Sequence, residues 1–330
     1  KKRTIFTKIL IWRYKYISER QFILVLSILV GFLAGLGTVL LKYLTLFIQS
    51  VLEGGFIKNY YYSLYFIFPI IGVWLVYLIK KNFIKKEIGH GISTTLYSIS
   101  KRSGIIERYK MFASLIVAPI TVGFGGSVGL QGPAVSTGAA LGSNVARLFH
   151  MNAKTRMLLI GCATAGAMSS MFKAPVAAIV FAIEIFSLDL VFASLVPLLL
   201  ASIAAVITSY FFRGTDVLFS FELLDAWRVK DIVFYVLLGL ATGVASVYFS
   251  KMYFLITRFF SRFSNAYIKI GIAAIAIGFM LYLFPPLYGE GYGLINNLLN
   301  GNTEVALSGI QYQIDFNNIW MVIVILLIIA

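Results

Sequence analysis

Long apolar segments recur along most of this chain, and they constrain its fold more than any other feature. The segment from Gln21 to Val51 exceeds the roughly 20 residues that an upright helix needs to cross a bilayer. Tyr60 to Ile79 has about the crossing length. Only 12% of the 330 residues are charged, about half the share found in soluble domains. The sequence therefore predicts an all-α integral membrane protein.

The basic residues that give the chain its net charge of +15 cluster beside the apolar segments. Seven Lys and Arg side chains fall in residues 1–20, and four lysines lie in residues 80–86, directly after an apolar run. Membrane proteins concentrate Lys and Arg in this way on the cytoplasmic side. We therefore expect a multi-pass protein of the cell membrane with a cytoplasmic N-terminus, and no nucleic-acid partner.

Residues 1–20 are expected to form a cytoplasmic segment. They contain either an interfacial helix around Ile5 to Tyr16 or a solvated basic tail. No small-residue cleavage site follows them, so a signal peptide is not predicted. A polar stretch at 214–230 separates a first membrane repeat, residues 21–213, from a partial second repeat, residues 231–330.

Two pairs of glycine motifs suggest that the two repeats are related. GFLAG at 31–35 and GLATG at 239–243 are each expected to open a long helix, and GHGI at 89–92 matches GYGL at 291–294. Internal repeats with glycine-interrupted segments are typical of secondary transporters, whose sites lie at the repeat interface. The second repeat is incomplete at Ala330, and we expect roughly a third of such a protein to follow it.

Two glycine-rich breaks have the chemistry of an anion site. GHGIS spans residues 89–93, and GGSVGLQGP spans residues 125–133, where Pro133 is expected to start a helix. Unpaired backbone amides in hydrocarbon are costly, so such breaks survive where they line a wet cavity or hold a ligand. A helix that begins after a break offers free N–H donors and the positive end of its dipole. The alternative is that these glycines only allow close helix packing.

The same segments carry a family resemblance. GHGIS resembles the GSGIP motif of CLC chloride channels and transporters, and GLQGP at 129–133 resembles their GREGP motif. FKAPVAAIVFAIE at 172–184 resembles the helix FNAPLAGILFIIEE. The three motifs stand in the family's order along the chain.

The resemblance implies a CLC-type inverted repeat of tilted and broken helices. It also implies a homodimer in membrane lipid, with one pathway for chloride or another halide in each subunit and both termini in the cytoplasm. Two further family signatures, GxFxP and a pore-lining tyrosine, would lie after Ala330. The anion-binding residues implied are Gly89, His90, Gly91, Ile92, Gly129, Gln131 and Gly132.

Gln131 is the first departure from the family pattern. The resemblance places a gating glutamate here, whose carboxylate competes with the anion and carries the proton in antiporters. An amide resembles the protonated acid but cannot titrate. Two interpretations stay open: a native passive conductor, or a glutamate replaced to trap one state.

Ile185 and Glu184 form the second departure. Chloride/proton antiporters of the family have a second glutamate where this chain has Ile185. Channel members lack this acid, as do some fluoride-type members, and its absence favours uncoupled transport. The neighbouring Glu184 either serves a proton path or forms a local structural contact, because acids inside membranes are costly and usually functional.

His90 is the third departure. It occupies the position that the resemblance links to anion selectivity, so a ring N–H is expected to donate a hydrogen bond to the anion. The alternative is a histidine packed beside the vestibule and bonded to backbone. With His90 in place of the family's serine, a chloride preference does not follow from the resemblance.

Enzyme chemistry is not expected. The chain has one cysteine and two histidines with no metal-ligand spacing, so neither a metal, a cofactor nor a disulfide is predicted. The preferred function is passive conduction of a small monovalent anion. The alternative is a chloride/proton or fluoride/proton antiporter.

Overall fold

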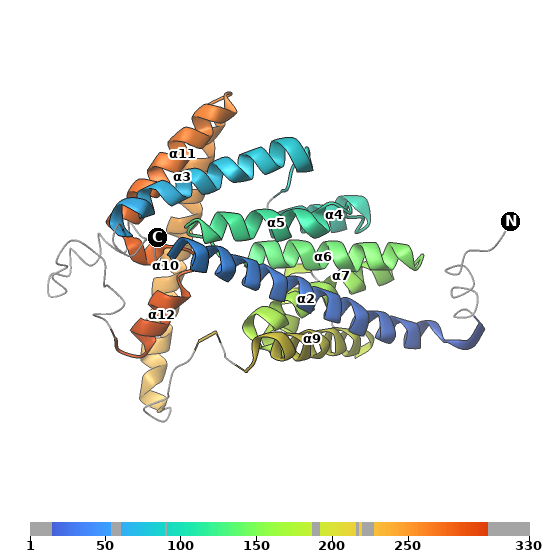
Figure 1. The fold of residues 1–330 in the computed structure, drawn as a ribbon. Coiled ribbons are helices and arrows are strands. Elements are labelled where there is room, and N and C mark those ends of the chain that lie inside the picture. Colours follow the sequence, from blue (N-terminus) through green and yellow to red (C-terminus); the bar gives the residue numbers. More distant parts are fainter. Residues whose placement is uncertain are drawn as a thin grey trace. The chain divides into compact units, whose positions relative to one another are not determined.

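The computed structural model describes residues 15–53, 61–89, 91–186, 192–215, 218–219 and 228–302. All regular structure in these residues is helical, which confirms the all-α prediction (Figure 1). The helices are α2 Glu19–Glu53, α3 Tyr61–Ile79, η1 Lys80–Ile84, α4 Gly91–Arg102, α5 Lys110–Gly123, α6 Gln131–Leu148, α7 Ala153–Phe172, α8 Pro175–Phe186, α9 Phe192–Arg213, η2 Val229–Asp231, α10 Ile232–Ser261, α11 Ala266–Leu283, η3 Pro285–Leu287 and α12 Tyr292–Leu299.

Five helical segments in the described residues are long and apolar enough to cross a membrane. They are Glu19–Leu52, Leu64–Ile84, Ser194–Arg213, Val229–Ser261 and Ala266–Leu283. The 35 residues of α2 extend over about 52 Å at 1.5 Å per residue. A hydrocarbon core is only about 30 Å thick, so α2 is longer than an upright crossing needs.

The chain divides into two compact units. The first contains residues 1–58, 75–124 and 128–218, and the second contains 59–74, 125–127 and 219–330. Helix α3 and the loop before α6 therefore each lie partly in one unit and partly in the other. Along the chain, the last change from the first unit to the second falls between residues 218 and 219, within the polar stretch 214–230.

Helix α7 forms the centre of the first unit and packs against α2, α6, α8 and α9 (Figure 1). Its residues from Leu159 to Met171 are all buried, and most of them are small. Small residues let helix backbones approach closely, which matters where lipid is as apolar as the helix surface. Gly142 of α6 lies against the Leu159 carbonyl group. A Cβ added to Gly138 would lie 2.8 Å from the Ala163 carbonyl oxygen.

Buried hydroxyl groups tie α7 to its neighbours. Ser169 donates to the carbonyl oxygen of Ser202 at 3.0 Å, and Ser209 donates to that of Ser170 at 2.9 Å. Ser170 in turn donates to the carbonyl oxygen of Gly35 at 3.3 Å. Interhelical hydrogen bonds of this kind contribute about 0.6 kcal/mol each in membrane proteins.

The glycine motifs GFLAG and GLATG do not open helices, so that prediction is wrong. Gly31 lies inside α2, which begins at Glu19, and Gly239 lies inside α10. The backbone of Ala201 in α9 lies directly against Gly31. In α2, glycine lets a neighbouring helix pack closely. Glycine is also frequent inside membrane helices, so it does not by itself mark a helix end.

In the second unit, the first part of α3 packs on α11. Gly278 of α11 lies against the Phe66 carbonyl group, and the rings of Tyr65 and Tyr288 meet edge to face at 5.2 Å. Helix α10 buries none of its residues in the part of the chain that the structure describes.

Gly31→Ala is expected to lower the stability of the protein, because an added Cβ would lie 2.6 Å from the Ala201 Cα. Overpacking of this kind costs about 1–3 kcal/mol. The matched control is Gly37→Ala on the same helix, whose Cβ would lie 3.4 Å from the nearest atom, Thr137 Cγ2. Thermal unfolding in detergent, followed by size-exclusion chromatography, measures both, and equal melting temperatures would contradict the packing described.

Candidate functional site

The first turns of α4 and α6 meet, backbone to backbone, within the first unit. Gly91 begins α4 with φ +47°. A Cβ on Gly91 would lie 3.0 Å from the carbonyl oxygen of Gly132 and 3.2 Å from its Cα. The two predicted glycine breaks therefore lie side by side at two helix N-termini.

Helix α6 begins at Gln131, two residues before the predicted start at Pro133. The first turn closes with a hydrogen bond of 2.9 Å from the Ala134 N–H to the Leu130 carbonyl oxygen. Proline is tolerated in a first turn because it has no N–H to satisfy there. Gln131 and Gly132 thus belong to the first turn of α6, at the positive end of the helix dipole. Leu130, at the N-cap, provides no side-chain cap.

Gln131 folds its side chain back over Gly129. A Cβ on Gly129 would lie 2.7 Å from the side-chain amide carbon of Gln131 and 3.1 Å from its Nε2. Only glycine at 129 leaves room for this conformation. A Cβ on Gly132, in contrast, would meet nothing within 4 Å, so open space adjoins the first turn of α6.

Helix α6 holds α4 and the loop after it. Ile92 packs its half-buried side chain against an apolar cluster that includes Val135 and Ala139 of α6. Ser143 of α6 donates to the Gly104 carbonyl oxygen at 2.6 Å and accepts from the Ile106 N–H at 3.0 Å. The side chain of Ile92 therefore packs in an apolar cluster and does not offer a polar group to a ligand.

The structure gives fewer contacts for the other residues that the sequence analysis named. Gly89 precedes α4 with φ +79°, in the left-handed region that glycine favours. His90 lies outside the described residues. Glu184 is exposed near the end of α8 and forms no ion pair with a residue that the structure describes, whereas Ile185 packs against the same apolar cluster as Ile92.

The backbone shows a second helix start that follows two glycines in the left-handed region. It lies within the GYGL motif at 291–294. Gly289 and Gly291 have φ +74° and +75°, and α12 begins at Tyr292. Gly89 and Gly91, before and at the start of α4, have the same left-handed geometry. Residues 289–291, with Glu290 in the middle, therefore have a glycine spacing and backbone geometry like those of residues 89–91, and Gly293 lies inside α12.

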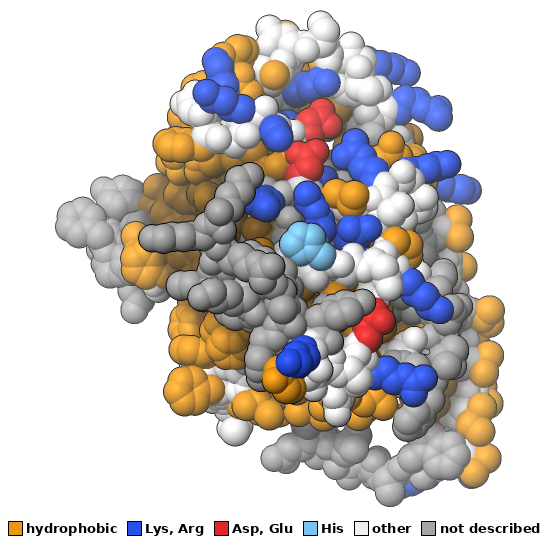
Figure 2. Space-filling model, turned by 90° about the vertical axis from the view of Figure 1, so that its right-hand side faces the viewer, with side chains coloured by type: hydrophobic (Ala, Val, Ile, Leu, Met, Phe, Trp, Pro, Cys, Tyr) orange, Lys and Arg blue, Asp and Glu red, His pale blue; other side chains and the backbone are white. Residues whose placement is uncertain are grey.

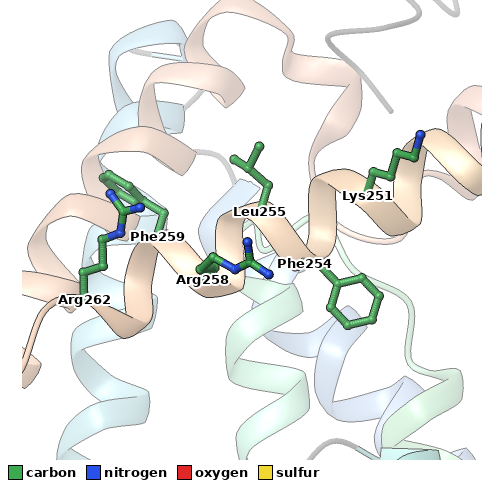
Figure 3. Close-up of a pocket in the computed structure, with 6 residues that line it drawn as sticks. All are labelled: Lys251, Phe254, Leu255, Arg258, Phe259 and Arg262. Atoms are coloured by element: carbon green, nitrogen blue, oxygen red, sulfur yellow. The ribbon is translucent and has the colours of Figure 1, made fainter.

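A further hollow lies along the second half of α10 and does not resemble an enclosed site. Its lining residues all project from one helix (Figure 3). They are Lys251, Phe254, Leu255, Arg258, Phe259 and Arg262. The described residues contain no group of three or more His, Cys, Asp or Glu side chains that could hold a metal ion.

Comparison with known proteins identifies the fold and the family. Residues 71–330 match the family model described as voltage gated chloride channel. The H+/Cl− exchange transporter ClcA of Vibrio cholerae is 30% identical over 54% of this chain and 40% of its own length. The chain covers 40–50% of the length of the first curated relatives that it matches.

Two solved structures share the fold. A CLC-type fluoride/proton antiporter matches 99% of this chain and 76% of its own, with a TM-score of 0.74 and 22% identity. A slow cyanobacterial Cl−/H+ antiporter matches 86% of this chain and 68% of its own, with a TM-score of 0.72 and 20% identity. At these identities the likeness shows the fold alone, and it confirms the CLC-type architecture of a multi-pass membrane protein.

Gly91→Ala is expected to destabilise the contact between α4 and α6, whereas Gly132→Ala is not. A left-handed residue other than glycine costs about 1–2 kcal/mol, and the Cβ on Gly91 would press on Gly132 at 3.0 Å. Thermal unfolding of the two variants, side by side, measures the difference. A Gly132→Ala protein that melts as low as Gly91→Ala would contradict the open space beside the first turn of α6.

Proposed function

This chain belongs to the voltage gated chloride channel family, and on that premise we propose that it moves a small monovalent inorganic anion, chloride or another halide, across a membrane. The observation that carries the proposal is the contact between Gly91 and Gly132 at the first turns of α4 and α6. Each helix N-terminus carries about half a positive charge and unpaired amides. Two such ends at one place attract an anion without a fixed cation, and the anion can also leave.

The proposed binding groups are the backbone amides of the two first turns. Gly89, Gly91 and Ile92 form the inner part with His90, and Gly129, Gln131 and Gly132 form the outer part. A ring N–H of His90 would add selectivity for the anion. Gln131 would act as the gate, because its amide folds over Gly129 beside the open space at Gly132.

Passive conduction is the preferred mode. Gln131 offers an N–H donor and a carbonyl acceptor but no proton that titrates, and Ile185 is an apolar packing residue. The alternative is an anion/proton antiporter. It is supported by the relative named as an H+/Cl− exchange transporter and by the fold neighbours named as antiporters.

A homodimer in membrane lipid, with a cytoplasmic N-terminus, belongs to the same proposal. Large apolar side chains such as Ile207 and Phe211 are exposed on α9 and need lipid or a second copy of the chain to cover them. Lys and Arg side chains gather on the face where α2 begins (Figure 2). That distribution favours the cytoplasm for this face.

Anion efflux from proteoliposomes, with a pH electrode in the same cuvette, tests the mode of transport. The full chain with Gln131 and the variant Gln131→Glu are compared in chloride and in fluoride. Passive conduction predicts anion loss without proton movement in both proteins. The physical reason is that a carboxyl group at residue 131 couples transport to protons only where a proton path reaches it, and Ile185 is an apolar packing residue.

Proton pumping that appears only in Gln131→Glu would overturn passive conduction as the native mode and support the antiporter alternative. If neither protein moves an anion, the proposed function itself is wrong. Unfolding temperatures of both proteins show whether loss of transport reflects loss of the fold.

Glu184→Gln separates the two modes independently. In passive conduction, anion flux changes less than about twofold, because no proton has to reach Gln131. In the antiporter alternative, Glu184→Gln in the Gln131→Glu background lowers proton movement by about tenfold, a change of about 1.4 kcal/mol in the barrier. Glu19→Gln, an exposed acid in the first turn of α2, is the matched control. An equal effect of both substitutions would exclude a proton path through Glu184.

A further inference from the structure

The segment Lys80–Lys86 combines four lysines with one exposed aromatic ring at the end of a membrane span. It has the sequence KKNFIKK, and the span Leu64–Ile84 ends inside it. Residues 80–84 form a π-helical turn that closes with a hydrogen bond of 2.8 Å from the Lys85 N–H to the Lys80 carbonyl oxygen. Lys80 and Lys85 therefore stand one helical turn apart.

The lysines differ in their partners. Lys86 forms an ion pair of 3.1 Å with Glu107, and its Nζ lies 5.1 Å from the centre of the Tyr109 ring. The hydrogen bond from Lys86 is the main cause that lowers the pKa of Glu107, so this pair stays charged near neutral pH. Lys80 and Lys85 form no ion pair with any residue that the structure describes. Their charges remain available to a ligand.

Phe83 is a large apolar side chain of this segment that is exposed. Its ring is 83% exposed, although it follows an apolar span. Because the candidate span ends at Ile84, we expect the ring at the depth where lipid headgroups meet acyl chains. Lysine side chains beside such a ring extend toward the headgroup phosphates. Figure 2 shows that Lys and Arg side chains gather on one face of the molecule, which adds to the attraction for anions.

We propose that the Lys80–Lys86 segment binds the headgroup of an anionic phospholipid. The ammonium groups of Lys80 and Lys85 contact the phosphodiester, and the Phe83 ring enters the boundary between headgroup and acyl chain. Free phosphate and the transported anion share the charge of the headgroup. Neither of them accounts for an apolar ring held outward among lysines, whereas a lipid covers both the ring and the charges.

Native mass spectrometry of the full chain with phosphatidylglycerol or phosphatidylcholine tests the proposal. Wild type is expected to retain phosphatidylglycerol in preference, and Lys80→Gln/Lys85→Gln lowers its apparent affinity by about tenfold or more. Lys101→Gln/Lys154→Gln removes two exposed lysines elsewhere and is the matched control. Equal losses in both double variants would overturn the proposal. Displacement of the lipid by millimolar inorganic phosphate would do the same.

A fluorophore at Phe83 tests the depth of the ring. The only native cysteine, Cys162, is fully buried, so Phe83→Cys provides a single labelling position. In nanodiscs, brominated lipids are expected to quench this label strongly, and more strongly when phosphatidylglycerol is present. A label that is quenched by an aqueous quencher and not by brominated lipid would place residue 83 in water and overturn the proposal.

Discussion

Everything at the candidate site depends on one backbone contact, that of Gly91 with Gly132. The missing Cβ of Gly91 lets the first turns of α4 and α6 approach at this distance, because a Cβ there would lie 3.0 Å from the Gly132 carbonyl oxygen. In the proposed function, a small anion is attracted to the positive ends of these two helices and can also depart. The contact therefore joins the fold to the proposed transport.

The contact is held in place by close packing of small residues and by buried hydroxyl groups. Helix α7 provides a buried surface of small residues for α6, and Gly138 and Gly142 bring the two backbones together. Ser143 then fixes the loop at Gly104 with two hydrogen bonds of its hydroxyl group. Since apolar side chains gain little by leaving lipid, close contact and buried hydroxyl groups have to stabilise the bundle. A cation in this region would cost far more, and it would bind an anion too tightly to release it.

A cluster of exposed lysines lies at the end of one candidate membrane span, where we propose that it binds lipid. Lys80 and Lys85 stand where a span ends, beside the exposed ring of Phe83. The described first turns of α4 and α6 contain glycine, amide and hydroxyl groups, with no acid or base among residues 91–93 and 129–133. Under the two proposals, this arrangement would allow one chain to hold an anion loosely inside the bundle and to bind headgroups more strongly outside it. The physical reason is the dielectric: the same charge costs little in the wet interface and much in hydrocarbon.

The sequence by itself determined the helical membrane class and the approximate extent of its helices. Gln21 to Val51 became α2, Glu19–Glu53, because hydropathy is a local property. It also located the breaks at 89–91 and 125–133, although it started α6 two residues late and took Gly31 for a helix start. Only the tertiary structure decided that Gly91 meets Gly132, that Gln131 folds over Gly129 and that Ile92 packs on α6. Those contacts depend on how separate helices pack, and no periodicity within one helix encodes which neighbour it will meet.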